Sequence, residues 1–428
     1  MPLSQLSRTL AFVAFTVIAT SSLRAAAKEK VLYAFNGGKG GADSYSSLIF
    51  DSTGNLYGTT QRGGHLSDCD GVGCGVVFKL TPDSSGKWKE TVLYTFHGGK
   101  DGAFPSAGLT LDPAGNLYGT AQLGGSTSGS LCQISGCGVV FKLVPGSGGT
   151  WKETVLHSFN GKDGSAPFAP VIFDTAGNLY GTAVNGGNSR GNGVVFQLTP
   201  DSKGKWKETV LHLFTGGKDG ALPFAAVISD TNGNLYGTTE GGGNLSDCAG
   251  FGCGVVFQLT PNSNGKWKET VLHTFAGGTD GATPFDLVLD PAGNLYGTTN
   301  SGGTQGNGTA FELSPSSGGG WKKTVLHNFG RPGDGGGPGA GLILEPTGNL
   351  YGTTIYGGSS CGSGCGTIFE LKPTSNGHWR EQILYTFRGG TDGAAPAADL
   401  TIGPGGNLYG TTPSGGAHNV GVVFEVSP

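Results

Sequence analysis

The sequence predicts an all-β fold, a seven-bladed β-propeller made of four-stranded antiparallel blades. The hexapeptide Gly-Asn-Leu-Tyr-Gly-Thr occurs seven times, and successive copies lie 55 to 62 residues apart, the spacing of a repeated supersecondary unit. Each unit contains four short runs of β-forming residues separated by turn sequences. The two ends of the chain supply complementary parts of one unit. A small sheet of this kind buries both faces only when neighbours stack on it in a ring.

Residues 1–27 have the pattern of a secretory signal peptide. Arg8 precedes an apolar run from Leu10 to Ile18, and small residues end the segment at Ala27. The alternative is a membrane anchor, but the run is much shorter than the ~20 residues that span a bilayer. We therefore expect cleavage before Lys28, a secreted protein (periplasmic or extracellular) without a membrane span, and one propeller domain over residues 28–428.

The second unit shows the expected strands in order. Leu109–Leu111 forms strand A, and Asp-Pro-Ala-Gly at 112–115 supplies a tight hairpin with proline and glycine at turn positions. Asn116–Ala121 forms strand B, Gly138–Leu143 strand C, and Trp151–Phe159 the longer strand D. Strands B and C are joined by a glycine-rich loop that differs between units.

The ends of the mature chain predict how the ring closes. Lys30–Phe35 matches strand D, and Gly421–Val426 matches strand C. The last blade should therefore take strands A, B and C from the C-terminus and strand D from the N-terminus, which leaves no open sheet edge at the seam.

The cysteines form four close pairs in the B–C loops: Cys69 and Cys74, Cys132 and Cys137, Cys248 and Cys253, Cys361 and Cys365. In an exported protein this pattern predicts local disulfides. Metal binding is the alternative, but two thiolates in one loop do not complete a tetrahedral zinc site. Antiparallel geometry places the B–C and D–A loops on one face of the ring, where loops that vary in length and chemistry would confer specificity.

The D–A loops repeat an Asp-Gly pair, with the aspartates Asp101, Asp163, Asp219, Asp280, Asp334 and Asp392. They could form a carboxylate ring that binds calcium or a polyhydroxylated ligand. The alternative, which recurrence at the same turn favours, is that each aspartate closes its own turn through backbone N–H groups. We therefore predict no cofactor, with calcium as the alternative.

Two sets of aromatic residues recur in strand D. Histidine stands at positions 157, 212, 273 and 327 where other units have tyrosine, an exchange that indicates packing with a polar tip rather than catalysis or metal ligation. Tryptophan begins the full-length D strands at positions 88, 151, 206, 267, 321 and 379. These rings could stack on sugars, but packing between blades is the favoured interpretation.

The residues just after strand B differ between blades: Gln61, Arg62, Gln122, Asn185, Glu240, Asn300 and Tyr356, with His65, Asp68 and Asp70 nearby. Polar groups that break the repeat on the variable face are candidates for a ligand site. We select Arg62, His65, Asp70, Glu240 and Tyr356 as ligand-binding residues. No nucleophile elbow, zincin motif or phosphate-binding loop occurs, so no catalytic or metal-binding residue is assigned.

Four motifs recur in a fixed order, as in Gly-Val-Val-Phe-Lys-Leu-Thr-Pro (75–82), Val-Leu-Tyr-Thr-Phe (92–96), Gly-Gly-Lys-Asp-Gly-Ala (98–103) and Gly-Asn-Leu-Tyr-Gly-Thr (115–120). They resemble the GloVer tandem repeat of bacterial "choice-of-anchor" exported proteins over residues 28–428. The resemblance implies an extracytoplasmic bacterial protein. The Asp-x-x-Gly-Asn-Leu-Tyr hairpin is also similar to that of NHL-type propellers, which implies the fold alone.

The function expected from these observations is binding without catalysis, with an extracellular carbohydrate or a cell-surface protein as the partner. A hydrolase or lyase acting on polysaccharide or a lactone from the central well is one alternative, and a structural envelope or matrix component is another. Without residues 1–27 the chain has 24 basic and 30 acidic residues, a net charge of −6. This charge predicts no binding to nucleic acid. The sequence makes no prediction of the oligomeric state.

Overall fold

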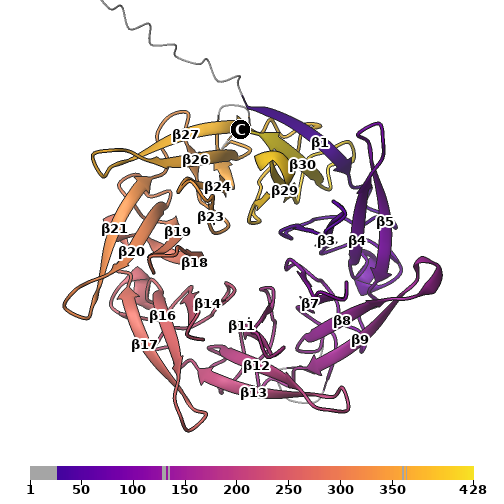
Figure 1. Cartoon of the computed structure of the whole chain (residues 1–428), viewed down its shortest axis with the longest axis horizontal. Helices are drawn as coiled ribbons and strands as arrows, with labels where there is room; N and C mark the ends of the chain where they lie inside the picture. The colour runs from indigo at the N-terminus through magenta and orange to yellow at the C-terminus, as the bar shows by residue number, and fades with distance from the viewer. Residues whose placement is uncertain (1–26, 128–131, 134, 359–360, 363) are drawn as a thin grey trace, which may run out of the picture.

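The computed structural model describes residues 27–428 except 128–131, 134, 359–360 and 363. The predicted signal peptide lies outside the described residues apart from Ala27. Seven four-stranded antiparallel sheets form a ring, with strand A nearest the centre and strand D on the outside (Figure 1). This confirms the predicted seven-bladed propeller. No helix among the described residues is long and apolar enough to cross a bilayer.

Strands A, which are short in every blade except the fifth, are β2 (Ile49–Phe50), β6 (Thr110–Leu111), β10 (Ile172–Phe173), β14 (Ile228–Ser229), β18 (Ala282–Leu289), β23 (Ile343–Leu344) and β28 (Thr401–Ile402). Strands B are β3 (Leu56–Thr60), β7 (Leu117–Ala121), β11 (Leu179–Ala183), β15 (Leu235–Thr239), β19 (Leu295–Ser301), β24 (Leu350–Thr354) and β29 (Leu408–Thr412). Strands C are β4 (Val76–Pro82), β8 (Val139–Pro145), β12 (Val194–Pro200), β16 (Val255–Pro261), β20 (Thr309–Pro315), β26 (Thr367–Pro373) and β30 (Val422–Ser427).

Strands D are β5 (Trp88–Thr95), β9 (Trp151–Ser158), β13 (Trp206–Leu213), β17 (Trp267–Thr274), β21 (Trp321–Asn328), β27 (Trp379–Thr386) and, from the N-terminus, β1 (Lys28–Ala34). A small pair, β22 (Gly335–Gly336) and β25 (Tyr356–Gly357), joins two loops of the sixth blade. Short 3₁₀ turns lie at Cys69–Gly71, Ser147–Gly149, Cys248–Gly250, Gly278–Asp280 and Pro404–Gly406.

The recurrent motif forms the A–B hairpin through side-chain hydrogen bonds. In the second blade, Asp112 accepts bonds from the backbone N–H of Asn116 (2.9 Å), its Nδ2 (2.7 Å) and the hydroxyl of Tyr118 (3.1 Å). An aspartate that satisfies its own turn favours this tight geometry. These bonds explain why asparagine and tyrosine recur with the hairpin aspartate.

Adjacent blades meet through two repeated aromatic contacts. A fully buried phenylalanine just after strand D lies edge-on to a phenylalanine of strand C in the next blade, as for Phe96 and Phe141, whose ring centroids are 5.1 Å apart. The tryptophan of strand D packs on the motif tyrosine of the preceding blade, as for Trp151 and Tyr57 at 6.5 Å. The expected packing role of the tryptophans is thus confirmed in these contacts.

The motif threonine connects strand B to the D–A segment of the next blade. Thr120 Oγ1 donates to the Ala169 carbonyl at 3.0 Å. Equivalent bonds run from Thr59, Thr182, Thr238, Thr298, Thr353 and Thr411. These bonds hold the D–A segments in place around the centre of the ring.

The ring closes as predicted. Strand β1 pairs antiparallel with β30, from Lys28 opposite Ser427 to Ala34 opposite Val422. Phe35 then packs on Phe78 of the first blade with ring centroids 5.3 Å apart, the same contact that joins the other blades.

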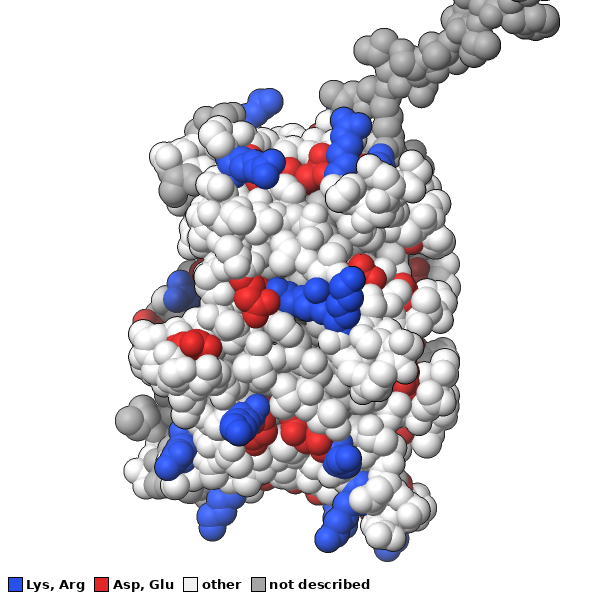
Figure 2. All heavy atoms as spheres, turned by 90° about the vertical axis from the view of Figure 1, so that its left-hand side faces the viewer, with Lys and Arg blue, Asp and Glu red and all other residues white. Residues whose placement is uncertain are grey.

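The B–C and D–A loops lie on one face, because they pair with each other at bridges such as Ala103 with Leu123 and Ala221 with Gly241. All four predicted disulfides are present: Cys69–Cys74, Cys132–Cys137, Cys248–Cys253 and Cys361–Cys365. Figure 2 shows acidic and basic side chains scattered over one side of the ring, without a broad patch of either sign.

Candidate functional site

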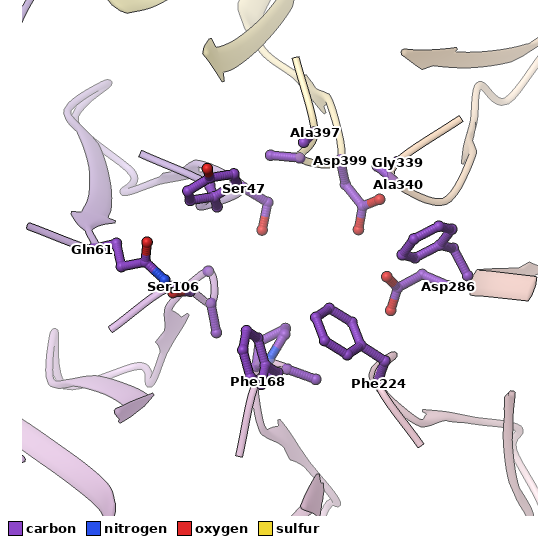
Figure 3. A pocket seen from close by; sticks show the side chains of 17 residues that line it. Ser47, Gln61, Ser106, Phe168, Phe224, Asp286, Gly339, Ala340, Ala397 and Asp399 are labelled. Atoms are coloured by element: carbon purple, nitrogen blue, oxygen red, sulfur yellow. Dashed lines mark hydrogen bonds between the residues drawn. The ribbon is translucent and has the colours of Figure 1, made fainter. Parts of the chain in front are cut away.

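A cavity of about 310 Å³ lies at the centre of the ring, where the D–A segments of all seven blades meet (Figure 3). Its wall is formed by Tyr45, Ser47, Gln61, Ser106, Ala107, Gly108, Phe168, Ala169, Pro170, Phe224, Phe285, Asp286, Gly339, Ala340, Ala397, Ala398 and Asp399. These residues come from the same segment of each repeat, apart from Gln61, which follows strand β3. The cavity is therefore a product of ring closure, since no single blade contains it.

Three phenylalanines line one side of the cavity. Phe168 and Phe224 lie with ring centroids 4.4 Å apart and planes tilted by 31°, and Phe285 meets Phe224 edge-on at 6.4 Å. They come from three successive blades, the third to the fifth. This aromatic arc offers flat apolar faces to a ligand, while the remaining wall consists mainly of small residues.

Two carboxyl groups, those of Asp286 and Asp399, point to the middle of the cavity (Figure 3). Asp286 Oδ1 accepts a hydrogen bond from the backbone N–H of Ala226 at 2.7 Å, and Asp399 Oδ1 accepts one from Gly341 at 2.7 Å. Each bond crosses to the preceding blade and fixes the side chain. Among the described residues, no Lys, Arg or His lines this cavity wall, so no basic side chain there offsets the two acids.

The surroundings of Asp286 and Asp399 favour their protonated forms. Burial, followed by repulsion from the Asp399 carboxylate, raises the pKa of Asp286 to about 8. Burial also raises the pKa of Asp399. A carboxyl pair of this kind can hold a proton near neutral pH, so it can both donate and accept hydrogen bonds.

The raised pKa predicts a pH-dependent stability. Because the pKa of Asp286 is higher in the folded than in the unfolded protein, protonation of this carboxyl group favours the folded state. This contribution to stability is fully present below the unfolded pKa of about 3.9 and is lost as pH rises through the folded pKa of about 8. We expect Asp286→Asn to flatten the loss of thermal stability between pH 5 and pH 9, relative to the parent protein. The measurement is the difference in unfolding midpoint between the two proteins across this range. Parallel profiles would contradict the expected shift.

The equivalent positions in the other blades show how Asp286 and Asp399 could have been found from sequence. The residue directly before the apolar start of strand A is Ser47, Gly108, Pro170, Ala226, Asp286, Gly341 and Asp399 in chain order. Two acids among small residues break the repeat on the variable face. The breaks selected from the sequence follow strand B, whereas Asp286 and Asp399 stand directly before the apolar residues of strand A.

The structure does not bring the five sequence-predicted site residues together. Arg62 forms an ion pair with Asp43 at 3.1 Å, and His65 stacks near the exposed His97 with ring centroids 5.1 Å apart. Asp70 lies exposed in the 3₁₀ turn of the first B–C loop. None of these three lines the central cavity.

The remaining two predicted residues lie elsewhere on this face. Tyr356 is half exposed, and its ring lies over Gly337. Glu240 borders a small pocket of about 70 Å³ that shares Phe224 and Phe285 with the central cavity. Burial raises the pKa of Glu240. Glu240 therefore shares two neighbours with the cavity wall, and ligand binding by all five residues stays a prediction.

Two of the polar residues that follow strand B in the sequence contribute to the cavity. Gln61 lines its wall, and Gln122 bonds to a residue of the wall. Gln61 Nε2 donates to Ser106 Oγ at 3.1 Å, and Gln122 Nε2 also donates to Ser106. Gln61 and Ser106 face the acidic side of the cavity in Figure 3. Gln61, which is not among the five selected residues, therefore contributes a repeat-breaking polar group to the cavity wall.

The recurrent D–A aspartates accept hydrogen bonds from backbone N–H groups of their own turns. His97 donates to Asp101 and Ala276 to Asp280, each at 2.9 Å, and the same bond forms at Asp163, Asp219, Asp334 and Asp392. None of the six lines the central cavity. In the first copy, Gly40 stands at the position of this aspartate. The strand D tyrosine Tyr33 therefore donates its hydroxyl hydrogen bond to Glu90, at 2.7 Å, whereas Tyr94 donates to Asp101 in the next copy.

Comparison with known proteins identifies the repeat. A search of curated proteins gives no match. A solved structure of a putative oxidoreductase (glucose dehydrogenase) from Thermus thermophilus is 13% identical over 94% of this chain and 100% of its own, with a TM-score of 0.40, which is too low to bear on activity. The family model of the Gloeobacter/Verrucomicrobia repeat matches residues 19–251, 132–318 and 246–428. The chain therefore belongs to the Gloeobacter/Verrucomicrobia repeat family, in agreement with its recurrent motifs and its seven-bladed ring.

Proposed function

We propose that this protein is an exported binding module that takes a small carbohydrate, or the end of a longer one, in its central cavity. The observation that supports this most is the combination of the aromatic arc with two carboxyl groups in one cavity. Four disulfides in loops of the same face are typical of a protein outside the cytoplasm.

The chemistry of the wall fits a sugar ring. The flat faces of Phe168 and Phe224 can pack against the apolar face of a pyranose, while Asp286 and Asp399 can accept hydrogen bonds from its hydroxyl groups. The volume of about 310 Å³ is at the lower end of the ~300–1,000 Å³ of ligand pockets. A small ligand or a chain terminus therefore fits better than the interior of a polysaccharide.

Binding is tested with purified residues 28–428 against a panel of mono-, oligo- and polysaccharides, by calorimetry with product analysis of the same mixtures. We expect Phe224→Ala and Asp286→Asn each to weaken binding about tenfold, which corresponds to ~1.4 kcal/mol. Phe251→Ala serves as the control, because Phe251 is 78% exposed in a B–C loop. Loss of binding in this control alone would move the site to the loops. The absence of binding to every sugar would reject carbohydrate as the ligand.

A second candidate is an acid–base hydrolase using the same cavity. It is favoured by the proximity of two carboxyl groups with raised pKa values, since a glycoside hydrolase needs one protonated and one ionised carboxyl group. Product release that Asp286→Asn or Asp399→Asn abolishes would favour this candidate over binding alone.

A further inference from the structure

A polar cluster recurs at the outer edge of the blade interfaces, away from the central cavity. Its members are the histidine or tyrosine of one strand D, the aspartate of the following D–A turn, and the third residue of strand D in the next blade. In the four interfaces with histidine these residues are His157, Asp163 and Glu208; His212, Asp219 and Glu269; His273, Asp280 and Lys323; and His327, Asp334 and Glu381. The imidazoles pack on phenylalanine, as expected from the sequence, with His157 edge-on to Phe159 at 4.7 Å.

One of these clusters holds a positive charge of its own. Lys323 Nζ lies 2.8 Å from Asp280 Oδ1 and also donates to the Asp280 carbonyl. Its side chain is only 7% exposed, and Nζ lies 5.0 Å and 5.5 Å from the ring centroids of Phe275 and Phe311. This interface therefore accommodates a buried cation beside the aspartate.

In the cluster of His157, Asp163 and Glu208, a glutamate replaces that lysine. The ligand atoms of the three residues lie within 4.8 Å of one another. His157 Nε2 is 3.2 Å from Asp163 Oδ2, but the pair is not aligned as a hydrogen bond, so His157 Nε2 is buried without a hydrogen-bond partner among the described residues, as is Glu208 Oε1. Burying polar atoms without partners is unfavourable, so this cluster is short of a positive group.

The cluster of His327, Asp334 and Glu381 has the same composition. His327 Nε2 lies 3.1 Å from Asp334 Oδ2 and 3.7 Å from Glu381 Oε2. The Asp334 side chain is 5% exposed, and Glu381 Oε1 is buried without a hydrogen-bond partner in the described part of the chain. The three ligand atoms again lie within 4.8 Å of one another.

We propose that these two clusters are binding sites for a divalent transition-metal cation of the Zn²⁺ type. One imidazole nitrogen and two carboxylate oxygens form a three-ligand set that zinc accepts, with a fourth position for water. Two ligands ~2.0–2.1 Å from a tetrahedral zinc ion lie about 3.3 Å apart, close to the separations of 3.1 and 3.2 Å in the two clusters. The bound ion takes the place that the Lys323 ammonium occupies in its own interface.

The site joins neighbouring blades. His157 belongs to strand β9 of the second blade, and Asp163 lies in the loop that follows this strand. Glu208 belongs to strand β13 of the third blade. A cation that binds all three therefore ties two blades together in the folded ring, and it stabilises that ring because the unfolded chain has no such preformed site.

The test is a titration of chelator-treated, full-length mature protein with Zn²⁺. Calorimetry measures the number of ions bound, and thermal unfolding measures the change in unfolding midpoint. The background carries His97→Ala, because His97, Asp68 and His65 form an exposed cluster that could also bind zinc. We expect two Zn²⁺ per chain and a raised unfolding midpoint. Glu208→Gln and Glu381→Gln should each remove one bound ion, and the pair should remove both.

Two further variants make the outcome specific. Glu208→Lys copies the Lys323 interface, so it should lose one Zn²⁺ yet unfold no earlier than the metal-free parent protein. Glu269→Gln is the matched control, because His212 Nε2 is 3.6 Å from Asp219 and this cluster is not gathered as closely. The proposal would be overturned if the parent protein bound no zinc. It would also be overturned if Glu208→Gln and Glu381→Gln both bound as much zinc as the parent. If Glu208→Gln fails to fold, the zinc content of Glu208→Lys tests whether the cluster of His157, Asp163 and Glu208 binds zinc.

Discussion

Deletion of residues 28–35 is expected to open the ring and to lower its free energy of unfolding strongly. The deletion removes β1, which supplies the whole outer strand of the seventh blade and pairs along β30. It also removes Phe35, a fully buried ring in the contact between the seventh and first blades. The exposed edge of β30 would then be free to pair with other chains, so aggregation should accompany the loss of stability.

A point variant separates the closing contact from the loss of the strand. Phe35→Ala keeps β1 but empties a fully buried site, and we expect it to lower the free energy of unfolding by ~3–5 kcal/mol. Phe251→Ala is the control, because that ring is 78% exposed and should change stability little. Urea unfolding followed by fluorescence and circular dichroism measures both. If the deletion variant unfolds as the parent protein does, the N-terminal strand does not close the ring.

Gly119→Ala is expected to destabilise the second blade by ~1–3 kcal/mol through overpacking. A Cβ atom at this position would lie 2.6 Å from Phe141 Cζ and 2.9 Å from Leu109 Cδ2. The backbone of Gly119 does not need a left-handed conformation, so the effect comes from the lack of space. The glycine thus recurs in the motif because a core phenylalanine of strand C packs directly on its backbone.

The matched control for this variant is Gly320→Ala, since no heavy atom beyond its two chain neighbours lies within 4 Å of the position that its Cβ would take. A second test is the double variant Gly119→Ala with Phe141→Leu. If overlap with the Phe141 ring is the cause, the double variant should be less destabilised than the sum of the two single variants. Additive effects, or an equal loss in Gly320→Ala, would contradict this explanation.

The candidate site was only partly predictable from sequence. Its face was predictable, because antiparallel strands place the B–C and D–A loops together, and Gln61 was among the polar residues noted after strand B. The carboxyl pair was missed, although Asp286 and Asp399 stand at one repeat position that is otherwise occupied by serine, glycine, proline or alanine. A comparison of the repeats position by position shows this break, but does not show that the position lines a cavity.

The local structure and the number of blades follow from the sequence alone. The hairpin aspartate, asparagine and tyrosine specify the A–B turn, and the cysteine pairs specify short disulfides, because their partners lie within a few residues in the chain. The complementary ends of the chain determined the closure, because strand β1 supplies the missing outer strand of the seventh blade.

Which side chains meet across blades depends on the packing of the whole ring. Asp286 and Asp399 are 113 residues apart in the chain and come from the fifth and seventh blades, yet both point into one cavity. Glu208 likewise reaches His157 and Asp163 of the preceding blade. Such contacts depend on the angle and spacing at which whole blades pack, and these are set by the buried phenylalanine pairs and threonine bonds between blades rather than by any local pattern in the sequence.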